Sequence, residues 1–489
     1  MIKMGKRIAA ILATACICVS LTACANNEGF ERKYTIDNPW WSTTGELRKE
    51  DNNVVFDDVD VNLTTVVTGA DYVGFKALVD TFNSEYRDKI HINISQLNDE
   101  GFENTVATNI INNSNAPDLI MSHQKGHAAL VERKIIQPFD EAMEKSGIKL
   151  DLNDYSASLT QYSSLGYEGY LFSLPIDVRS EVVYYNKTLL GTNELPTNRS
   201  ELIELCNTVK EGKGSGFIPI ATKTAESAQF PEGKYFALYT FPTAIVQNGG
   251  HLYNDSFYAD WADDADNLEA FKDAVTSIKD LVGQGLMQYN MGGDALNKFL
   301  SNQALFYVGV PWELKSVIKA YGDKHSLSED KVISDYLGGT SLAGWFALDK
   351  NADAEYANRI FGDSHCFAMS KTVTDINKKA AMLEFMKWYT QTVSTGTAWA
   401  EAGHMSASTI VTTDSAYTEN TYVANFINNF YSDINQIECM GISPYFEEIN
   451  RGLGSLFASM QSISGANKIE AAIRTAQDDV NEEISFAEM

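Results

Sequence analysis

The chain has 489 residues, of which 65 are Asp or Glu and 38 are Lys or Arg, so its formal net charge is −27. A surface this acidic repels phosphate backbones, which argues against nucleic acid as a partner and against a polybasic contact with lipid headgroups. The length is sufficient for two to three domains.

The first 23 residues have the features of an export signal. Basic residues within Lys3–Arg7 precede an uncharged run over 8–23, which is shorter than the ~20 apolar residues that cross a bilayer. The run ends in Leu21-Thr22-Ala23-Cys24, which resembles the bacterial lipobox, where the peptide is cut before the cysteine and the thiol is acylated. We therefore expect a signal peptide at 1–23, lipidation at Cys24 and a lipid anchor on the extracellular face of a bacterial cell membrane. The alternative is a single-span anchor with a coincidental cysteine.

Residues 24–60 are polar and irregular, and we expect their first part to be a tether between the lipid and the folded body. Trp40 and Trp41 interrupt that composition. Two adjacent tryptophans could form a stacking platform for a sugar, but we favour a contact that packs back on the body. Asp58-x-Asp60-x-Asn62 opens like a calcium loop but lacks the glycine and the closing glutamate, so we expect no calcium there.

Three cysteines remain in the mature chain, namely Cys206, Cys366 and Cys439. Their odd number and wide spacing indicate neither a disulfide framework nor a CxxC metal site. We expect them to pack as small buried side chains, and we expect neither a metal nor a cofactor.

From Val61 onward, strand-like and helix-like segments alternate. The helix is clearest at 75–86, where apolar residues recur at i, i+3, i+4, i+7 and i+11. The other expected elements are strands at 61–68, 90–94 and 119–121, and helices at 102–113, 128–135 and 139–145. This alternation predicts βαβ units and a mainly parallel sheet.

The stretch Gly169–Lys187 is the pivot of the predicted organisation. Two strand-like runs, Tyr170–Leu174 and Glu181–Tyr185, are separated by Pro175 and a polar segment at 177–180. Proline lacks the amide hydrogen that a central strand donates, so the first run should end there. We interpret the stretch as a crossing between two lobes, whose polar residues face a ligand cleft. The alternative is an ordinary bent strand in a single domain.

Alternation resumes beyond the pivot, and catalytic motifs are scarce. We expect helices around 202–209, 268–282, 382–389, 449–460 and 469–480, and strands at 216–221 and 304–310. There is no HExxH, G-x-S-x-G or GxxxxGK[ST] sequence. A pair of carboxylates for glycoside hydrolysis stays open, because the two acids need only be close in space.

Several blocks, in the family's order, resemble the family 1 extracellular solute-binding proteins of bacterial carbohydrate ABC transporters, the maltose-binding-protein-like group. Besides the lipobox, they are FKALVDTFNSEY (75–86), APDLIMSH (116–123), YLFSLPIDVRSEVVYYNKTLL (170–190), VQNGGHLYND (246–255), ALFYVGVPWEL (304–314) and LEFMKWYTQTVSTGTAWAEAGHMSAS (383–408). The resemblance implies an α/β, two-lobed, type II periplasmic-binding-protein-like fold, with mainly parallel sheets flanked by helices and a ligand cleft between the lobes. The implied ranges are 61–176 and 366–412 for lobe 1, and 177–365 and 413–489 for lobe 2, with a third crossing near 409–414.

The resemblance also implies binding residues. Trp312 matches the family's stacking tryptophan, and an aromatic face suits the C–H face of a pyranose. The other candidates lie where the family places hydrogen-bonding groups; they are Asp71, His123, Gln124, Lys125, Asp177 and Arg179. The chain departs from the maltose pattern after the third strand and again at Gly403-His404-Met405-Ser406, which lacks a proline. Maltose is therefore not implied as the ligand.

Two functions follow as alternatives. The first is capture of a sugar or oligosaccharide by a monomeric, non-enzymatic protein that delivers it to the separate permease and ATPase chains of an ABC importer. The second is a secreted surface glycoside hydrolase or lyase.

Overall fold

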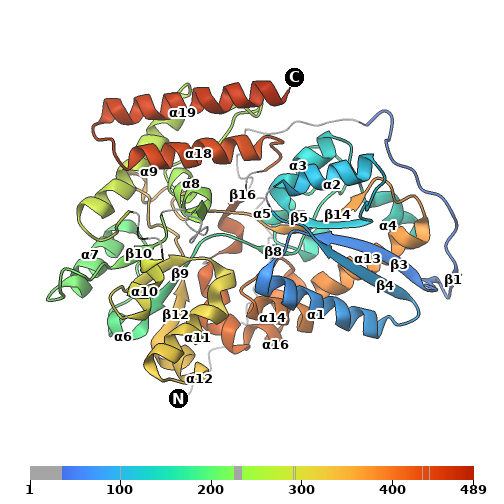
Figure 1. Cartoon of the computed structure of the whole chain (residues 1–489), viewed down its shortest axis with the longest axis horizontal. Helices are drawn as coiled ribbons and strands as arrows, with labels where there is room; N and C mark the ends of the chain where they lie inside the picture. Colours follow the sequence, from blue (N-terminus) through green and yellow to red (C-terminus); the bar gives the residue numbers. More distant parts are fainter. Residues whose placement is uncertain are drawn as a thin grey trace, which may run out of the picture.

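The computed structural model describes residues 36–99, 101–224, 234–289, 291, 293–431, 433–439 and 441–488. The predicted signal at 1–23 and the lipidation site Cys24 lie outside these residues. The chain folds into two lobes that stand side by side, each with its own sheet and covering helices (Figure 1). In the part of the chain described, no helix has the length and apolar character needed to cross a membrane.

Lobe 1 is built on a sheet of order β4-β3-β5-β14-β6, with β7 also paired to β14. Its strands are β3 Val59–Thr65, β4 Ile90–Gln96, β5 Leu119–His123, β6 Ile136–Gln137, β7 Leu174–Pro175 and β14 His365–Ser370. Its helices are α1 Gly69–Glu85, α2 Phe102–Ile111, α3 Gln124–Glu132, α4 Asp140–Ser146 and α13 Ile376–Gln391. The helix predicted from apolar spacing is confirmed, because α1 buries Phe75, Val79 and Phe82.

Lobe 2 is built on a sheet of order β10-β11-β9-β12. Its strands are β9 Val182–Asn186, β10 Ile220–Thr222, β11 Phe306–Gly309 and β12 Leu337–Thr340. Its longer helices are α7 Arg199–Lys210, α8 Phe241–Val246, α9 Ala265–Gly283, α10 Asp294–Leu300, α11 Leu314–His325, α18 Phe446–Met460 and α19 Ala466–Ala487. Short turns of helix complete it at α6 Lys187–Leu190, η3 Phe236–Thr240, η4 Pro311–Glu313, α12 Glu329–Lys331, η5 Val332–Tyr336 and η6 Asp349–Asn351.

Both sheets are mixed, which corrects the expectation of mainly parallel sheets. β3 runs parallel to β4 and β5, but β14 is antiparallel to β5, and β9 is antiparallel to both β11 and β12. β9 and β14 are the strands that arrive from the other lobe. Each enters its sheet from the cleft edge, so its first residue faces the last residue of a neighbouring strand, His365 opposite His123 and Val182 opposite Gly309.

The predicted pivot carries the chain from the lobe 1 sheet to the lobe 2 sheet. β7 pairs in lobe 1, β8 Asp177–Val178 pairs with β15 Met405–Ser406, and β9 pairs in lobe 2. The first predicted run is shorter than expected, since only Leu174–Pro175 of that stretch forms a strand. Tyr170 and Phe172 instead turn their rings onto Trp41.

The region predicted to hold a third crossing is helical. α14 Val393–Glu401, α15 Thr409–Thr412 and α16 Ser415–Thr418 lead to η7 Val423–Ile427, which packs on β12 of lobe 2. The remaining segments are η1 Leu152–Asp154, α5 Ala157–Thr160, β13 Ile360–Gly362, α17 Asn428–Phe430, η8 Ile434–Gln436 and β16 Ile437–Cys439. β13 and β16 pair with each other in parallel between the lobes.

The described part of the extension packs on lobe 1, as expected for Trp40 and Trp41. Trp40 stacks on Phe172 and donates its indole hydrogen to Ile136 O at 2.8 Å. The hairpin β1 Lys49–Glu50 and β2 Asn53–Val54 follows. Buried Lys379 donates to Ser42 O at 2.9 Å and fixes the extension to α13.

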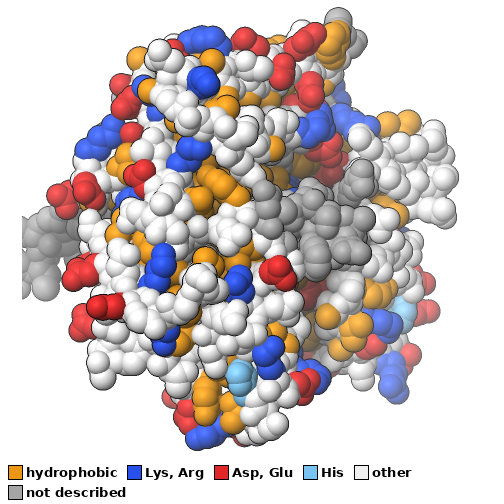
Figure 2. Space-filling view, turned by 60° about the vertical axis from the view of Figure 1, so that its left-hand side comes forward, with side chains coloured by type: hydrophobic (Ala, Val, Ile, Leu, Met, Phe, Trp, Pro, Cys, Tyr) orange, Lys and Arg blue, Asp and Glu red, His pale blue; other side chains and the backbone are white. Residues whose placement is uncertain are grey.

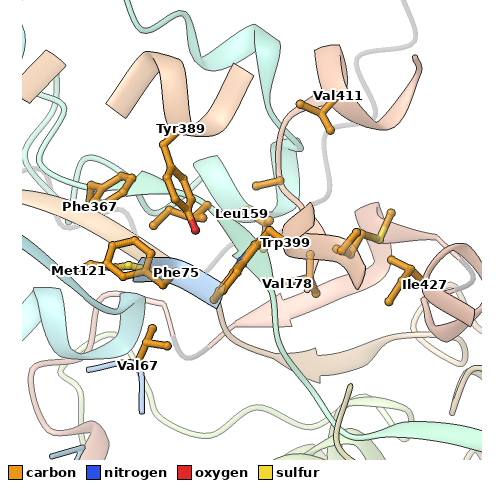
Figure 3. Packing of buried hydrophobic residues seen from close by; sticks show 14 of the residues in the cluster. Val67, Phe75, Met121, Leu159, Val178, Phe367, Tyr389, Trp399, Val411 and Ile427 are labelled. Atoms are coloured by element: carbon orange, nitrogen blue, oxygen red, sulfur yellow. The ribbon is translucent and has the colours of Figure 1, made fainter. Parts of the chain in front are cut away.

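A continuous apolar core joins the lobes where the chain crosses between them. Trp399 of α14 lies between Phe75 and Tyr389 of lobe 1 and Val178 of the crossing (Figure 3). The three mature cysteines are buried and unpaired, as predicted. On the face seen in Figure 2, acidic and basic side chains are interspersed.

Candidate functional site

The chain crossings bring the ends of several strands to one junction between the lobes. The pairing of β14 with β5 sets His365 beside His123, and their ring centroids are 5.2 Å apart. An isolated antiparallel bridge joins Arg179 to Asp363 through backbone hydrogen bonds of 2.8 and 2.7 Å. Lys125, in the first turn of α3, points its ammonium to within 3.9 Å of Asp363 Oδ2. The lobe 1 sheet, an isolated bridge and one helix therefore place charged side chains around one point.

Trp312 reaches this junction from lobe 2. It sits in η4, directly after β11, and Pro311 fixes the turn that presents it. The ring is half-buried, meets Tyr235 edge-on at 5.2 Å and lies over the Arg179 guanidinium, 4.7 Å from carbon to ring centroid. It is also nearly parallel to the His404 ring at 6.5 Å. Trp312 is thus an aromatic surface next to a cation.

Arg179 is buried, with 7% of the residue exposed. Its Nε and Nη1 atoms have no hydrogen-bond partner among the described residues. The neighbours that affect it electrostatically are Tyr235, Tyr239, Asp363 and Asp99. The Arg179 side chain packs against Trp312, while two of its nitrogens are buried without a hydrogen-bond partner in the described part of the chain.

Asp177 is the centre of a buried network below the junction. Its Oδ1 accepts a hydrogen bond from His365 N at 2.8 Å. Its Oδ2 accepts from His365 Nδ1 at 2.7 Å and from Trp399 Nε1 at 2.9 Å. His404 Nδ1 lies 3.3 Å from the same oxygen, and His404 Nε2 lies 3.4 Å from Asp71 Oδ2. The network ties β8, β14, α14 and α1 together.

The charges in this network follow from burial and partners. Burial alone would lower the pKa of His404, but Asp177 and Asp71 outweigh it and raise the pKa to about 9. Burial opposes ionisation of Asp177, yet the two histidines hold its pKa well below the usual range. Burial lowers the pKa of His365. At neutral pH His404 is therefore an imidazolium between two carboxylates, and His365 is neutral.

Asp177, His365 and His404 are also the described residues that could ligate a metal, since one donor atom of each lies within 4.8 Å of the others. The Asp177 carboxylate already accepts hydrogen bonds from His365 and Trp399 on both oxygens. The hydrogen bonds and ion pairs account for the cluster, and we assign no metal to it.

A recess of about 310 Å³ opens beside the junction. His123 and Lys125 line it, and His123 Nδ1 lies 3.1 Å from Asp99 Oδ1. Burial and the nearby Arg179 hold the pKa of His123 well below its usual range, and burial raises the pKa of Glu103 to about 7. The lining comes from both lobes and consists of Asp99, Glu103, His123, Lys125, Lys234, Phe446 and Glu447.

The structure gathers most of the predicted site residues but gives them different positions. His123, Lys125, Arg179 and Trp312 surround the junction. Asp71 and fully buried Asp177 are members of the network beneath it. Gln124 turns away, because its amide donates to Leu159 O at 3.2 Å in the interior.

Sequence reasoning missed Asp363, His365 and His404. All three lie in segments that follow a long excursion through lobe 2, so their neighbours are set by tertiary pairing. The sequence did contain one signal for His404. This residue lies in Gly403-His404-Met405-Ser406, the turn that lacks the proline expected from the family pattern.

Two α/β lobes joined by crossing segments, with polar and aromatic side chains at the junction, define a two-lobed ligand-binding protein. The sequence profile of the bacterial extracellular solute-binding protein family matches residues 77–425. The chain belongs to this family, which confirms the resemblance seen in its sequence.

Curated relatives match over short segments. The sn-glycerol-3-phosphate-binding periplasmic protein UgpB of Pectobacterium atrosepticum is 27% identical over 154 residues, 31% of this chain and 29% of that protein. UgpB of Escherichia coli K12 is 30% identical over 73 residues, 15% of this chain and 17% of that protein. The similarity thus spans less than a third of these relatives.

Solved structures match over nearly the whole chain. The sugar-binding protein MalE from Xanthomonas citri aligns with a TM-score of 0.67 and 13% identity, covering 88% of this chain and 100% of that one. The cyclic alpha-maltosyl-1,6-maltose binding protein from Arthrobacter globiformis aligns with a TM-score of 0.64 and 17% identity, covering 87% and 98%. At these identities the likeness shows the two-lobed fold alone.

Proposed function

We propose that this solute-binding protein captures a sugar or oligosaccharide between its lobes and delivers it to an ABC importer whose permease and ATPase are separate chains. One observation carries the proposal: Trp312 from lobe 2 lies over the guanidinium of Arg179 at the crossing, and Arg179 in turn is close enough to His123 of lobe 1 to lower its pKa. A pyranose offers an apolar C–H face to an aromatic ring and hydroxyls to charged groups.

The names of similar proteins support a polyhydroxylated ligand. The solved neighbours include proteins described as binding maltose and cyclic alpha-maltosyl-1,6-maltose, and the curated relatives are described as binding sn-glycerol-3-phosphate. This chain differs from the pattern of maltose-binding proteins at His123, Lys125 and His404. These differences favour a ligand other than maltose.

Delivery to a transporter requires a signal that the protein is loaded, and hinge closure supplies one. Close contact between the lobe 2 turn and the α14 end supports such a hinge, since a Cβ on Gly403 would lie 2.0 Å from Pro311 O. The strand pairings support lobe ranges of 61–176 and 366–412 for lobe 1, and 177–365 and 413–489 for lobe 2. We infer that the protein acts as a monomer at the extracellular face of the membrane, held by acylated Cys24 after removal of 1–23.

The test is incubation of the purified protein with a panel of mono- and oligosaccharides that includes maltose and sn-glycerol 3-phosphate. The melting temperature is recorded, and the ligand is recovered and analysed by chromatography. A raised melting temperature with unchanged ligand supports capture. Shortened oligosaccharide would contradict it and identify a surface glycoside hydrolase or lyase.

A further inference from the structure

The buried guanidinium of Arg179 has no ion pair with a described residue in the junction, whereas several charged neighbours lie at ion-pair distance from one another. Asp177 and Asp71 hold His404, Asp99 holds His123, and Lys125 lies 3.9 Å from Asp363. The Arg179 side chain makes no hydrogen bond to a described residue. Neither Asp363 nor Asp99 comes within the 4.0 Å of an ion pair with it.

Arg199 shows how this chain normally buries an arginine. It is 5% exposed, close to the 7% of Arg179. Its Nη1 donates to Ser277 Oγ at 2.9 Å, and its Nη2 lies 3.6 Å from Asp280 Oδ2. The two residues are similarly exposed, but the guanidinium in lobe 2 has a hydrogen bond and an ion pair, and the guanidinium at the junction has neither with any residue that the structure describes.

A buried cation without a hydrogen-bonded counter-charge is costly to the folded protein, so such groups are paired in native structures or await a ligand. The planar fork of arginine matches the oxygens of a carboxylate or phosphate better than single hydroxyls. Trp312 covers one face of the guanidinium at 4.7 Å and leaves its N–H groups directed in the plane. The donors without a hydrogen-bond partner among the described residues are Nε and Nη1, and both atoms are buried.

We propose that the solute bound at this junction is acidic, and that its carboxylate or phosphate-ester oxygens pair with the Arg179 guanidinium while a sugar ring lies against Trp312. This inference rests on the proposed function, which it narrows from carbohydrates in general to uronates or sugar phosphates. Lys125 is the second cation within reach of the junction.

The test compares neutral and acidic sugars of the same shape. The probes are D-galactose with D-galacturonate, α-1,4-galactobiose with digalacturonate, and D-glucose with D-glucose 6-phosphate, the last pair separating phosphate esters from carboxylates. Dissociation constants are measured by calorimetry for the wild type, Arg179→Gln and Arg179→Lys. We expect an acidic member to bind at least about tenfold more tightly than its neutral counterpart, because charge-assisted pairs are about twice as strong as neutral ones. Arg179→Gln should abolish the difference, and Arg179→Lys should retain part of it.

A second readout needs no ligand. Arg179→Gln breaks no hydrogen bond to a described residue, so the melting temperature of the ligand-free protein should fall little, although Asp363 and Asp99 lose an attracting charge. The matched variant Arg199→Gln breaks contacts with Ser277 and Asp280 and should lower it. If Arg179→Gln destabilises the protein as much as Arg199→Gln, the guanidinium has a partner in the protein and the inference is overturned.

The outcomes also separate this inference from the proposed function. Equal binding of neutral and acidic members, or a preference for acid that survives Arg179→Gln, overturns the inference and leaves carbohydrate capture standing. If no member of either set of sugars binds, both the inference and the proposed function are overturned.

Discussion

At the scale of single residues, Trp312 is the group whose removal should affect binding most directly. Its half-buried ring has Arg179 on one side and Tyr235 at its edge. Trp312→Ala should weaken sugar binding by ~1–3 kcal/mol, roughly 5- to 150-fold, through loss of aromatic contact.

The matched control is Trp388, a half-buried tryptophan on α13 that donates to Glu85 at 2.8 Å. Trp388→Ala should leave the dissociation constant unchanged. Calorimetry with the tightest-binding panel member measures both. Equal affinity in Trp312→Ala and the wild type would remove Trp312 from the site.

His404 should make stability depend on pH. Its pKa is raised to about 9 in the folded protein, from 6.5 when unfolded, by Asp177 and Asp71 against the effect of burial. The stabilisation from these ion pairs is fully present below pH 6.5 and is lost as the pH rises through 9. The unfolding free energy of the wild type should exceed that of His404→Gln by up to ~3 kcal/mol more at pH 6 than at pH 9.5.

Urea denaturation of both proteins at several pH values measures this difference. Taking the difference cancels other groups that titrate in the same window, such as Glu181 and Lys379. A gap between the two proteins that stays constant with pH, or that widens as the pH rises, would show that His404 is not the imidazolium described here.

Sequence could predict which residue types reach the junction but not how they pair. His123, Lys125, Arg179 and Trp312 follow strand ends or mark the crossing, so their place near the cleft depends on local order. Gln124 follows a strand as closely as Lys125 does, yet one step of helical rotation turns it into the interior. Asp363 and His365 reach the site through pairing with Arg179 and His123, over separations that local patterns do not encode.

At the scale of elements, Gly403 sets how closely the α14 end approaches the η4 turn of lobe 2. Its φ is +106°, and a Cβ there would lie 2.0 Å from Pro311 O, which belongs to the backbone and cannot turn aside. Gly403→Ala should push the two elements apart and weaken sugar binding, because closure brings both lobes onto the ligand.

Gly454 in α18 is the matched control, since a Cβ there meets nothing within 4 Å. Gly454→Ala should preserve affinity and, as a helix-interior change, add up to ~1 kcal/mol of stability. Affinity for the same sugar is measured in both variants. Undiminished binding in Gly403→Ala would show that this contact is not needed for the closed state.

Helices were easier to predict than the sheets. The apolar spacing at 75–86 identified α1 because a helix displays its buried face within its own sequence. Strand direction is not local in this way. β9 and β14 enter their sheets from the cleft, so an alternating pattern that predicts parallel βαβ units gave the wrong direction for them.

At the scale of the whole molecule, membrane attachment is the first prediction. Because the proposed anchor is the acylated thiol of Cys24, Cys24→Ser should abolish incorporation of labelled palmitate and release the protein from the cell surface. The substitution should leave folding unaffected, because Cys24 lies in the expected tether and not in the folded body. The melting temperature of Cys24→Ser should therefore equal that of the wild type. Palmitate labelling that persists in Cys24→Ser would contradict the lipid anchor.

The central claim is that a sugar is captured by closure of two nearly rigid lobes about the crossing at Pro175–Ser180. Ligand favours the closed state only through its differential affinity for it, and groups on both lobes supply that difference. Small-angle scattering is the most direct test, using the panel member that raises the melting temperature most. We expect a smaller radius of gyration at saturating ligand than without it, whereas an unchanged scattering curve under those conditions would contradict closure of the lobes.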